Sequence, residues 1–167
     1  MGVLSKMFGT PRRRREKGIQ IGPPPWWEII PSKAVADFIQ SLPVLLPSDT
    51  ILYFEGTLDS QVADLLRRHQ VNDPVPVQRG TLWPKLDIHH SLIADELLKG
   101  LVDQVKSGVV PYPSIHFHAY RGNSVLLQWH DAFHDDPLLV SNSITEDKVA
   151  HFCERIGSKY SFIEIGG

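Results

Sequence analysis

The chain of 167 residues contains one cysteine, Cys153, so no internal disulfide can form. A disulfide-stabilised scaffold is therefore excluded, and we expect a reducing, cytoplasmic environment. A lone thiol most often serves as a small buried hydrophobe, and no base in the sequence is evidently placed to activate Cys153 as a nucleophile.

Long apolar segments are also missing from the sequence. No run approaches the roughly 20 apolar residues that a transmembrane helix needs. The opening stretch MGVLSKMFGT lacks the apolar core of a signal peptide, and a basic cluster follows it instead of preceding it. We therefore expect a protein without a transmembrane segment.

Diagnostic catalytic motifs are absent too. There is no GxGxxG or Walker loop to hold nucleotide phosphates, and no HExxH or CxxC pair to hold zinc. No GxSxG sequence is present to form a nucleophile elbow. These absences exclude several common enzyme classes and leave open whether the protein is an enzyme.

The charge that is present is unevenly distributed. Residues 1–20 carry six basic groups and one acidic group, a net charge of +5, which leaves −7 for residues 21–167 because the whole chain carries −2. The run Arg12–Arg15 could contact an acidic surface, lipid or nucleic acid non-specifically, or could remain a solvated leader. An acidic body of this kind suits a partner of basic character.

The amino-acid composition divides the chain into three segments. Residues 1–20 form a basic flexible leader, residues 21–31 a linker rich in proline and tryptophan, and residues 32–167 a single α+β domain. Trp26 and Trp27 are costly to leave in water, so we expect at least one of them to pack on the body. An exposed pair would instead indicate a partner-binding surface.

Apolar periodicity predicts helices and strands in alternation. The helices are expected after Ser32 and ending before Pro43, after Thr57, between Ser91 and Lys106, and between Thr145 and Gly157. The strands are expected at 50–55, 75–77, in a β-hairpin over 114–130, at 137–142 and at 160–165. This order predicts a two-layer α+β sandwich with a mixed, mostly antiparallel sheet covered by three to four helices.

The central hairpin 114–130 carries four of the eight histidines if its following loop is included. A two-residue turn at Gly122 and Asn123 would mix polar and apolar side chains on both faces. A three-residue loop ending at Ser124 separates them, so we expect that register. The apolar face then holds Ile115, Phe117, Ala119, Val125, Leu127 and Trp129, and the polar face holds His116, His118, Tyr120, Leu126, Gln128 and His130.

One functional hypothesis starts from that polar face. His116, His118 and His130 would lie close enough to bind Zn²⁺ or a similar ion, with Asp131, His134 or Asp135 as further ligands. Asp131 or Glu55 could then activate a bound water in a metal-dependent hydrolase. His89 and His90, expected at the start of the third helix, could complete a cleft. A solvated polar face explains the same histidines without a metal.

The other hypothesis, which we favour, is a non-catalytic interaction or regulatory protein that needs no cofactor. The segment HDAFHDD (130–136) places Asp131, Asp135 and Asp136 within six residues. Such an acidic surface could bind a basic protein partner by charge complementarity, as immunity and inhibitor proteins do. Trp26 and Trp27 are the candidate apolar contacts.

Overall fold

An antiparallel sheet runs through residues 17–30 and 34–166, the part of the chain that this computed structural model describes. Its strands are β1 (Trp26–Ile30), β2 (Ile51–Gly56), β3 (Asp87–Leu92), β4 (His116–Arg121), β5 (Ser124–Trp129), β6 (Leu138–Ser141) and β7 (Lys159–Ile163). The helices are α1 (Val35–Leu45), α2 (Ser60–Arg68), α3 (Asp95–Lys106) and α4 (Glu146–Ile156). The strand order is β3-β2-β4-β5-β6-β1-β7, and each neighbouring pair is antiparallel.

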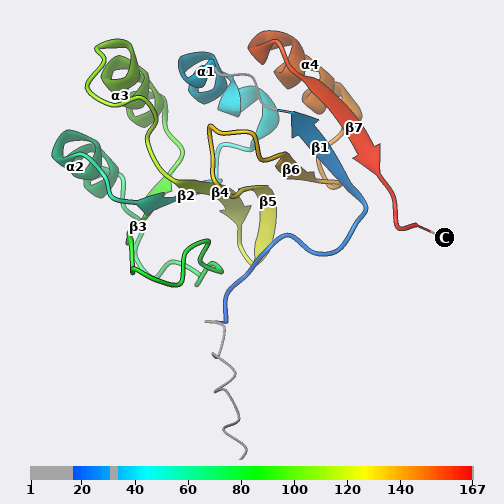
Figure 1. Cartoon of the computed structure of the whole chain (residues 1–167), viewed down its shortest axis with the longest axis horizontal. Helices are drawn as coiled ribbons and strands as arrows, with labels where there is room; N and C mark the ends of the chain where they lie inside the picture. Colours follow the sequence, from blue (N-terminus) through cyan, green and yellow to red (C-terminus); the bar gives the residue numbers. More distant parts are fainter. Residues whose placement is uncertain (1–16, 31–33, 167) are drawn as a thin grey trace, which may run out of the picture.

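All four helices lie on one face of the sheet (Figure 1). The predicted α+β architecture with a mostly antiparallel sheet is therefore confirmed. The longest of the described helices, α3, has 12 residues, and no helix among residues 17–30 and 34–166 has the length and apolarity to span a bilayer.

The main core fills the space between helices and sheet, and the ring of Phe38 on α1 lies near its centre. Its centroid is 5.7 Å from that of Phe117, 5.0 Å from Trp129 and 5.8 Å from Phe152. Phe38 is buried because the helical period places it on the same face as Ile39, Leu42 and Leu45. This aromatic cluster connects α1 with the central hairpin and with α4.

The opposite face of the sheet is also covered, but by chain without regular structure. Tyr53, Tyr120 and Val125 point to this side and pack with Val77 in a second, smaller core. The segment 17–21 joins the cover through a parallel bridge between Ile19 and Val77. The backbone amide of Ile21 also donates to Gln128 Oε1 on β5, at 3.0 Å. Both faces of the hairpin are consequently shielded from water.

β1 was not expected, because it lies in the segment that composition indicates as a linker. Trp26–Ile30 pairs with β6 on one side and with β7 on the other. The residues WWEII have high strand propensity, but both partner strands are more than 100 residues away in sequence. Local patterns cannot show pairing over that separation, and the preceding prolines suggested an irregular chain.

β3 corrects a second prediction. Ser91 does not begin the third helix but lies in β3, and α3 starts at Asp95. His89 and His90 therefore belong to a strand, not to a helix start. The pairing of Asp87–Leu92 with β2 decides the conformation of a segment whose own propensity is weak.

Helix boundaries differ in smaller ways. α1 continues through Pro43 to Leu45, which is tolerated because the proline lies in the last turns and is exposed. Asp59, not Thr57, caps α2, since its Oδ1 accepts from the amide of Gln61 at 2.8 Å. Residues 75–77 form only the isolated bridge described above, and Ser32 lies outside the described residues. α4 begins after Thr145 and ends at Gly157 as predicted.

Candidate functional site

The register of the hairpin combines the two alternatives that the sequence offers. Next to the turn, Arg121 pairs with Ser124, so the loop holds only Gly122 and Asn123. A bulge then shifts the pairing by one residue, and from Ala119 onward the pairs follow the three-residue prediction. The predicted faces of two residues were therefore wrong: Val125 lies in the smaller core with Tyr120, and Leu126 lies in the main core.

Beyond the bulge, the three hairpin histidines come together on the side opposite Trp129. The ring centroid of His130 lies 5.4 Å from that of His116 and 4.9 Å from that of His118. This face is not a solvated surface, however, because His116 is 3% exposed and His118 is 1% exposed. Only His130 reaches the surface.

Glu55 accepts hydrogen bonds from the segment that covers these histidines. Its side chain is fully buried, and Oε2 accepts hydrogen bonds from the hydroxyl of Tyr53 at 2.7 Å and the amide of Gly80 at 2.8 Å. Oε1 accepts from the amide of Thr81 at 3.0 Å. A buried carboxylate with three donors is satisfied without a cation nearby. Glu55 therefore fastens the segment containing residues 80 and 81 to the sheet.

Gly80 is needed where this segment crosses the hairpin. A Cβ atom at this position would lie 2.4 Å from the ring of His116, far inside van der Waals contact. The neighbouring Thr81 Oγ1 lies 2.8 Å from His116 Nε2. The covering segment thus approaches His116 as closely as the backbone permits.

Hydrogen bonds to the backbone determine which ring nitrogens carry protons. The amide of Asp131 donates to His116 Nδ1 and the amide of Trp129 donates to His118 Nδ1, both at 3.1 Å. Each Nδ1 must therefore be unprotonated, so in a neutral ring Nε2 carries the hydrogen. His116 Nε2 donates to Thr81, whereas His118 Nε2 has no hydrogen-bond partner among the described residues.

This pattern is unlike that of a metal site. A metal-bound imidazole presents a nitrogen lone pair to the ion and usually donates a hydrogen bond through its other nitrogen. In His116 and His118 the lone pairs are already used by backbone amides. Among residues 17–30 and 34–166, no group of three or more His, Cys, Asp or Glu side chains is placed to hold a metal ion.

Burial favours the neutral form of two histidines on this face, His118 and His130. Desolvation, followed by the proximity of His130 and His116, lowers the pKa of His118 well below its ordinary value. Desolvation and His116 also lower the pKa of His130, although Asp131, Glu55 and Asp136 partly oppose that shift. The imidazoles of His118 and His130 therefore resist accepting protons.

His89 and His90 lie on opposite faces of β3 and do not form a common cleft. His89 pairs with Phe54, whose side chain is in the main core, whereas His90 Nδ1 lies 2.9 Å from the hydroxyl of Tyr120 on the other face. Burial lowers the pKa of His90 to about 4, and it raises the pKa of Tyr120 to about 12.

The segment 130–136, called here the acidic loop, is fixed at several points. Besides the amide of Asp131, the amide of Ala132 donates to the carbonyl of Ile115 at 2.7 Å. The indole of Trp129 donates to the carbonyl of Asp136 at 2.9 Å. Phe133, with φ +69°, packs its ring 4.7 Å from that of Trp129. Hydrogen bonds at residues 131, 132 and 136 and the packing of the Phe133 ring thus fix the backbone of the acidic loop.

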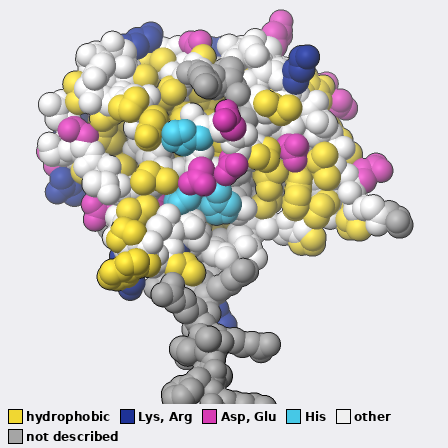
Figure 2. Space-filling view, in the orientation of Figure 1, with side chains coloured by type: hydrophobic (Ala, Val, Ile, Leu, Met, Phe, Trp, Pro, Cys, Tyr) yellow, Lys and Arg dark blue, Asp and Glu magenta, His cyan; other side chains and the backbone are white. Residues whose placement is uncertain are grey.

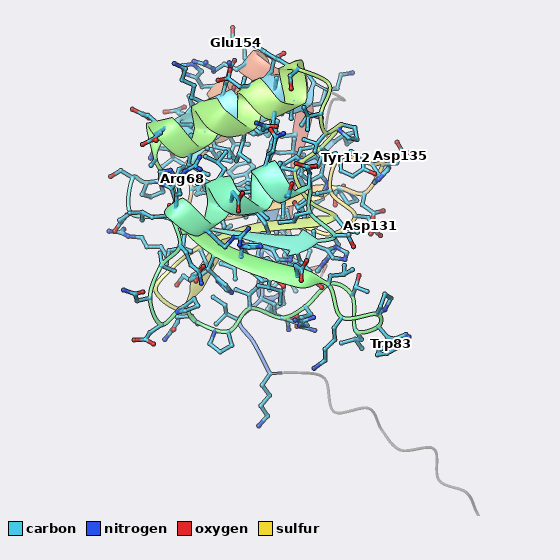
Figure 3. The ribbon with its side chains drawn as sticks, turned by 90° about the vertical axis from the view of Figure 1, so that its left-hand side faces the viewer. Arg68, Trp83, Tyr112, Asp131, Asp135 and Glu154 are labelled. Carbon is cyan, nitrogen blue, oxygen red and sulfur yellow. The ribbon has the colours of Figure 1, made fainter. Side chains whose placement is uncertain are left out.

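The carboxylates of the acidic loop face outward. Asp131, Asp135 and Asp136 are all exposed, and no described lysine or arginine forms an ion pair with them. Figure 2 shows acidic side chains gathered beside histidines in the middle of one face of the molecule. Asp131 and Asp135 lie at the same end of the structure as Tyr112 and the exposed Trp83 (Figure 3).

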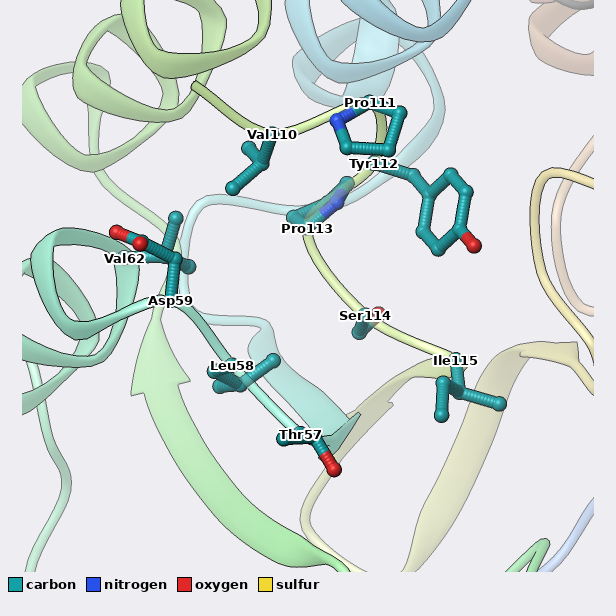
Figure 4. Close-up of a pocket in the computed structure, with 10 residues that line it drawn as sticks. All are labelled: Thr57, Leu58, Asp59, Val62, Val110, Pro111, Tyr112, Pro113, Ser114 and Ile115. Carbon is teal, nitrogen blue, oxygen red and sulfur yellow. The ribbon is translucent and has the colours of Figure 1, made fainter.

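A hollow of about 280 Å³ opens beside the acidic loop, between the start of α2 and residues 110–115 (Figure 4). Its walls are largely apolar and include Leu58, Val62, Val110 and Pro113. Ser114 also lines the hollow; it is 3% exposed, and its hydroxyl has no hydrogen-bond partner among the described residues.

Tyr112 connects the hollow with the acidic loop. It lines the hollow, and its ring stacks on Phe133 at 6.2 Å and meets the edge of His134 at 5.4 Å. Sequence reasoning missed this hollow. The stretch VVPYPS (109–114) contains two prolines around a tyrosine, which indicates an irregular loop but not what that loop encloses.

Trp26 and Trp27 do not join the acidic loop. Trp26 pairs with Ser141, at the far end of β6 from the loop. Trp27 packs against the main core, and its indole donates to the carbonyl of Ile144 at 2.9 Å. Trp83, which is 78% exposed, lies instead on the same side of the molecule as Asp131 and Asp135 of the acidic loop.

Comparison of the chain with protein-family models, with curated proteins and with solved structures gave no match. The geometry of the acidic loop, the hollow and the buried histidines is therefore the basis for assigning a function.

Proposed function

We propose that this is a non-catalytic interaction protein that binds a basic segment of a protein partner through the acidic loop. The observation that carries the proposal is the presence of exposed carboxylates, without a described lysine or arginine as ion-pair partner, on a loop whose backbone is fixed. Lysine and arginine side chains would supply the missing positive charge.

The fixed backbone matters for affinity. Ordering a mobile loop on binding would oppose association by a conformational entropy term. Here the bonds from Asp131, Ala132 and Trp129 already hold the loop in the free protein. The negative charge of residues 21–167 would in addition accelerate encounters with a basic partner, mainly at low ionic strength.

The leader of the chain is itself basic and would compete for the same surface. Arg12–Arg15 could contact the acidic loop, an anionic lipid or a nucleic acid through charge alone. We place this interaction in the cytoplasm, because a chain with a single cysteine has no internal disulfide, as is usual for proteins of a reducing compartment.

The test measures binding of a fluorescein-labelled, arginine-rich peptide to the full chain by fluorescence anisotropy. Replacing both Asp135 and Asp136 by lysine should weaken binding by about tenfold or more at low salt, because attraction becomes repulsion. The matched control replaces Asp103 on α3 and Glu154 on α4 by lysine, which changes the net charge equally. Figure 3 shows Glu154 at the top of the molecule, away from Asp131 and Asp135 on its right-hand side.

The control variant should retain most of the affinity of the unchanged protein. Equal losses in the two variants would show that only overall charge matters and would contradict a specific role for the acidic loop. Absence of peptide binding by the unchanged protein at low salt would also contradict the proposal.

A further inference from the structure

We infer that the hollow beside Tyr112 receives one aliphatic side chain of the basic segment that the acidic loop binds. This inference rests on the proposed function and names a second recognition element for the same partner. The partner segment would therefore carry a leucine, isoleucine, valine or methionine close to its basic residues.

The apolar walls of the hollow favour an aliphatic side chain. Pockets for drug-sized ligands and cofactors usually enclose roughly 300–1,000 Å³. This hollow, of about 280 Å³, lies at the lower limit of that range, and Leu58, Val62 and Val110 give it an apolar wall. An aliphatic group entering it would leave water and contact carbon atoms on several sides. A charged group would lose hydration against these apolar residues; the carboxylate of Asp59, which also lines the hollow, is exposed and accepts a hydrogen bond from the amide of Gln61.

Ser114 supplies a polar contact within these apolar surroundings. A buried hydroxyl without a partner is energetically unfavourable, and the structure gives Ser114 Oγ no partner among the described residues. Its Oγ atom is covered in the free protein, so a peptide carbonyl at the rim reaches it only if the entering side chain moves the residues over it. In that case the Ser114 hydroxyl donates to the carbonyl and fixes the depth and orientation of the segment.

Tyr112 sets the distance between the two recognition elements. Its ring separates the hollow from the acidic loop, and its contacts with Phe133 and His134 hold it in place. An extended peptide advances about 3.3 Å per residue, so the partner segment crosses the ring within a few residues. We therefore expect the aliphatic residue to lie about that far from the first lysine or arginine of the partner segment.

The experiment compares two arginine-rich peptides that differ only in one leucine, which is replaced by alanine in the second. The protein is the full chain with Arg12–Arg15 changed to alanine, so that its leader does not compete. The leucine peptide should bind about tenfold more tightly, because most of a leucine side chain becomes buried. Binding is measured by fluorescence anisotropy at fixed salt concentration.

Three protein variants locate the effect. Thr57→Trp places a large side chain at an exposed position that lines the hollow and should abolish the preference for leucine. Gln61→Trp, at an exposed position of α2 that does not line the hollow, is the matched control and should preserve it. Ser114→Ala should weaken the leucine peptide several-fold without lowering the melting temperature of the free protein.

The outcomes separate this inference from the proposed function. Equal binding of both peptides, still lost on changing Asp135 and Asp136 to lysine, would overturn the hollow as a subsite and leave the acidic loop as the binding element. Failure of both peptides to bind would overturn the two together. A leucine preference that survives Thr57→Trp would show that leucine binds elsewhere.

Discussion

The amide of Trp129 donates a hydrogen bond to the Nδ1 atom of His118 across the hairpin, at 3.1 Å. In the same way the amide of Asp131 donates to His116. Both rings thus complete the backbone hydrogen bonding of the chain as it leaves β5 for the acidic loop. The histidines whose pattern indicates a metal site in the sequence thus support the backbone at the start of the acidic loop.

This arrangement predicts that the hairpin histidines do not hold a metal. Protein purified without a histidine tag should contain far less than one equivalent of zinc. In ¹⁵N NMR spectra at pH 7, His116 and His118 should show the tautomer protonated at Nε2, and added Zn²⁺ should leave those signals unchanged. Stoichiometric zinc that is lost on replacing His116 and His118 by alanine would restore the zinc-hydrolase hypothesis.

Stability should fall as the pH is lowered from 6.5 toward 4. The pKa of His90 is lowered to about 4 by burial, whereas an unfolded histidine titrates near 6.5. Between these values the unfolded chain binds more protons, so acid favours unfolding; above about pH 6.5 this contribution is fully present. Melting temperatures measured from pH 7 to pH 5 should therefore decrease.

A substitution can assign part of that decrease to His90. In His90→Asn the dependence on pH should be shallower, because one buried group no longer titrates, while the amide oxygen can still accept from the hydroxyl of Tyr120. The exposed His151→Asn on α4 serves as the control and should keep the original slope. Identical slopes in all three proteins would contradict this assignment.

Gly80→Ala should destabilise the protein by about 1–3 kcal/mol, because the added methyl group meets the ring of His116 and forces the covering segment away. The hydrogen bonds to Glu55 would weaken at the same time. Urea unfolding measures the effect. At Gly22 a Cβ atom would meet nothing within 4 Å, so Gly22→Ala should change the free energy of unfolding by much less.

Phe38→Ala should cost about 3–5 kcal/mol of unfolding free energy, since it leaves a cavity among Phe117, Trp129 and Phe152. Gln40→Ala, an exposed change on the same helix, should cost much less. A loss below about 1 kcal/mol for Phe38→Ala would show that α1 is not central to the core.

Sequence patterns predicted the elements whose signals are local. Thr145, the acidic residues after it and Gly157 mark α4 within one short stretch, and the alternation around Phe117 and Leu127 marks the hairpin. The separation of polar and apolar residues placed the three hairpin histidines on one face, where the structure has them. It could not show that this face is covered, because the cover comes from residues 17–21 and 75–81.

The remaining differences have non-local causes. β1 and β3 are strands because of partners elsewhere in the chain, and the bulge near Leu126 depends on how both faces of the hairpin are packed. The hollow arises where residues 110–115 pass the start of α2, two segments that the sequence separates by about 50 residues. The acidic residues were visible in the sequence, but their fixed loop and the adjacent hollow were not.

The position of β1 between β6 and β7 has a consequence for synthesis on the ribosome. When Trp26–Ile30 emerges, neither neighbouring strand has been translated. β6 becomes available once Ser141 has left the exit tunnel, and β7 only after Ile163 has left it. Contacts of such high sequence separation slow folding and expose the unpaired strand to nascent neighbours. A chain released before β6 is translated would thus lack both strands that pair with β1.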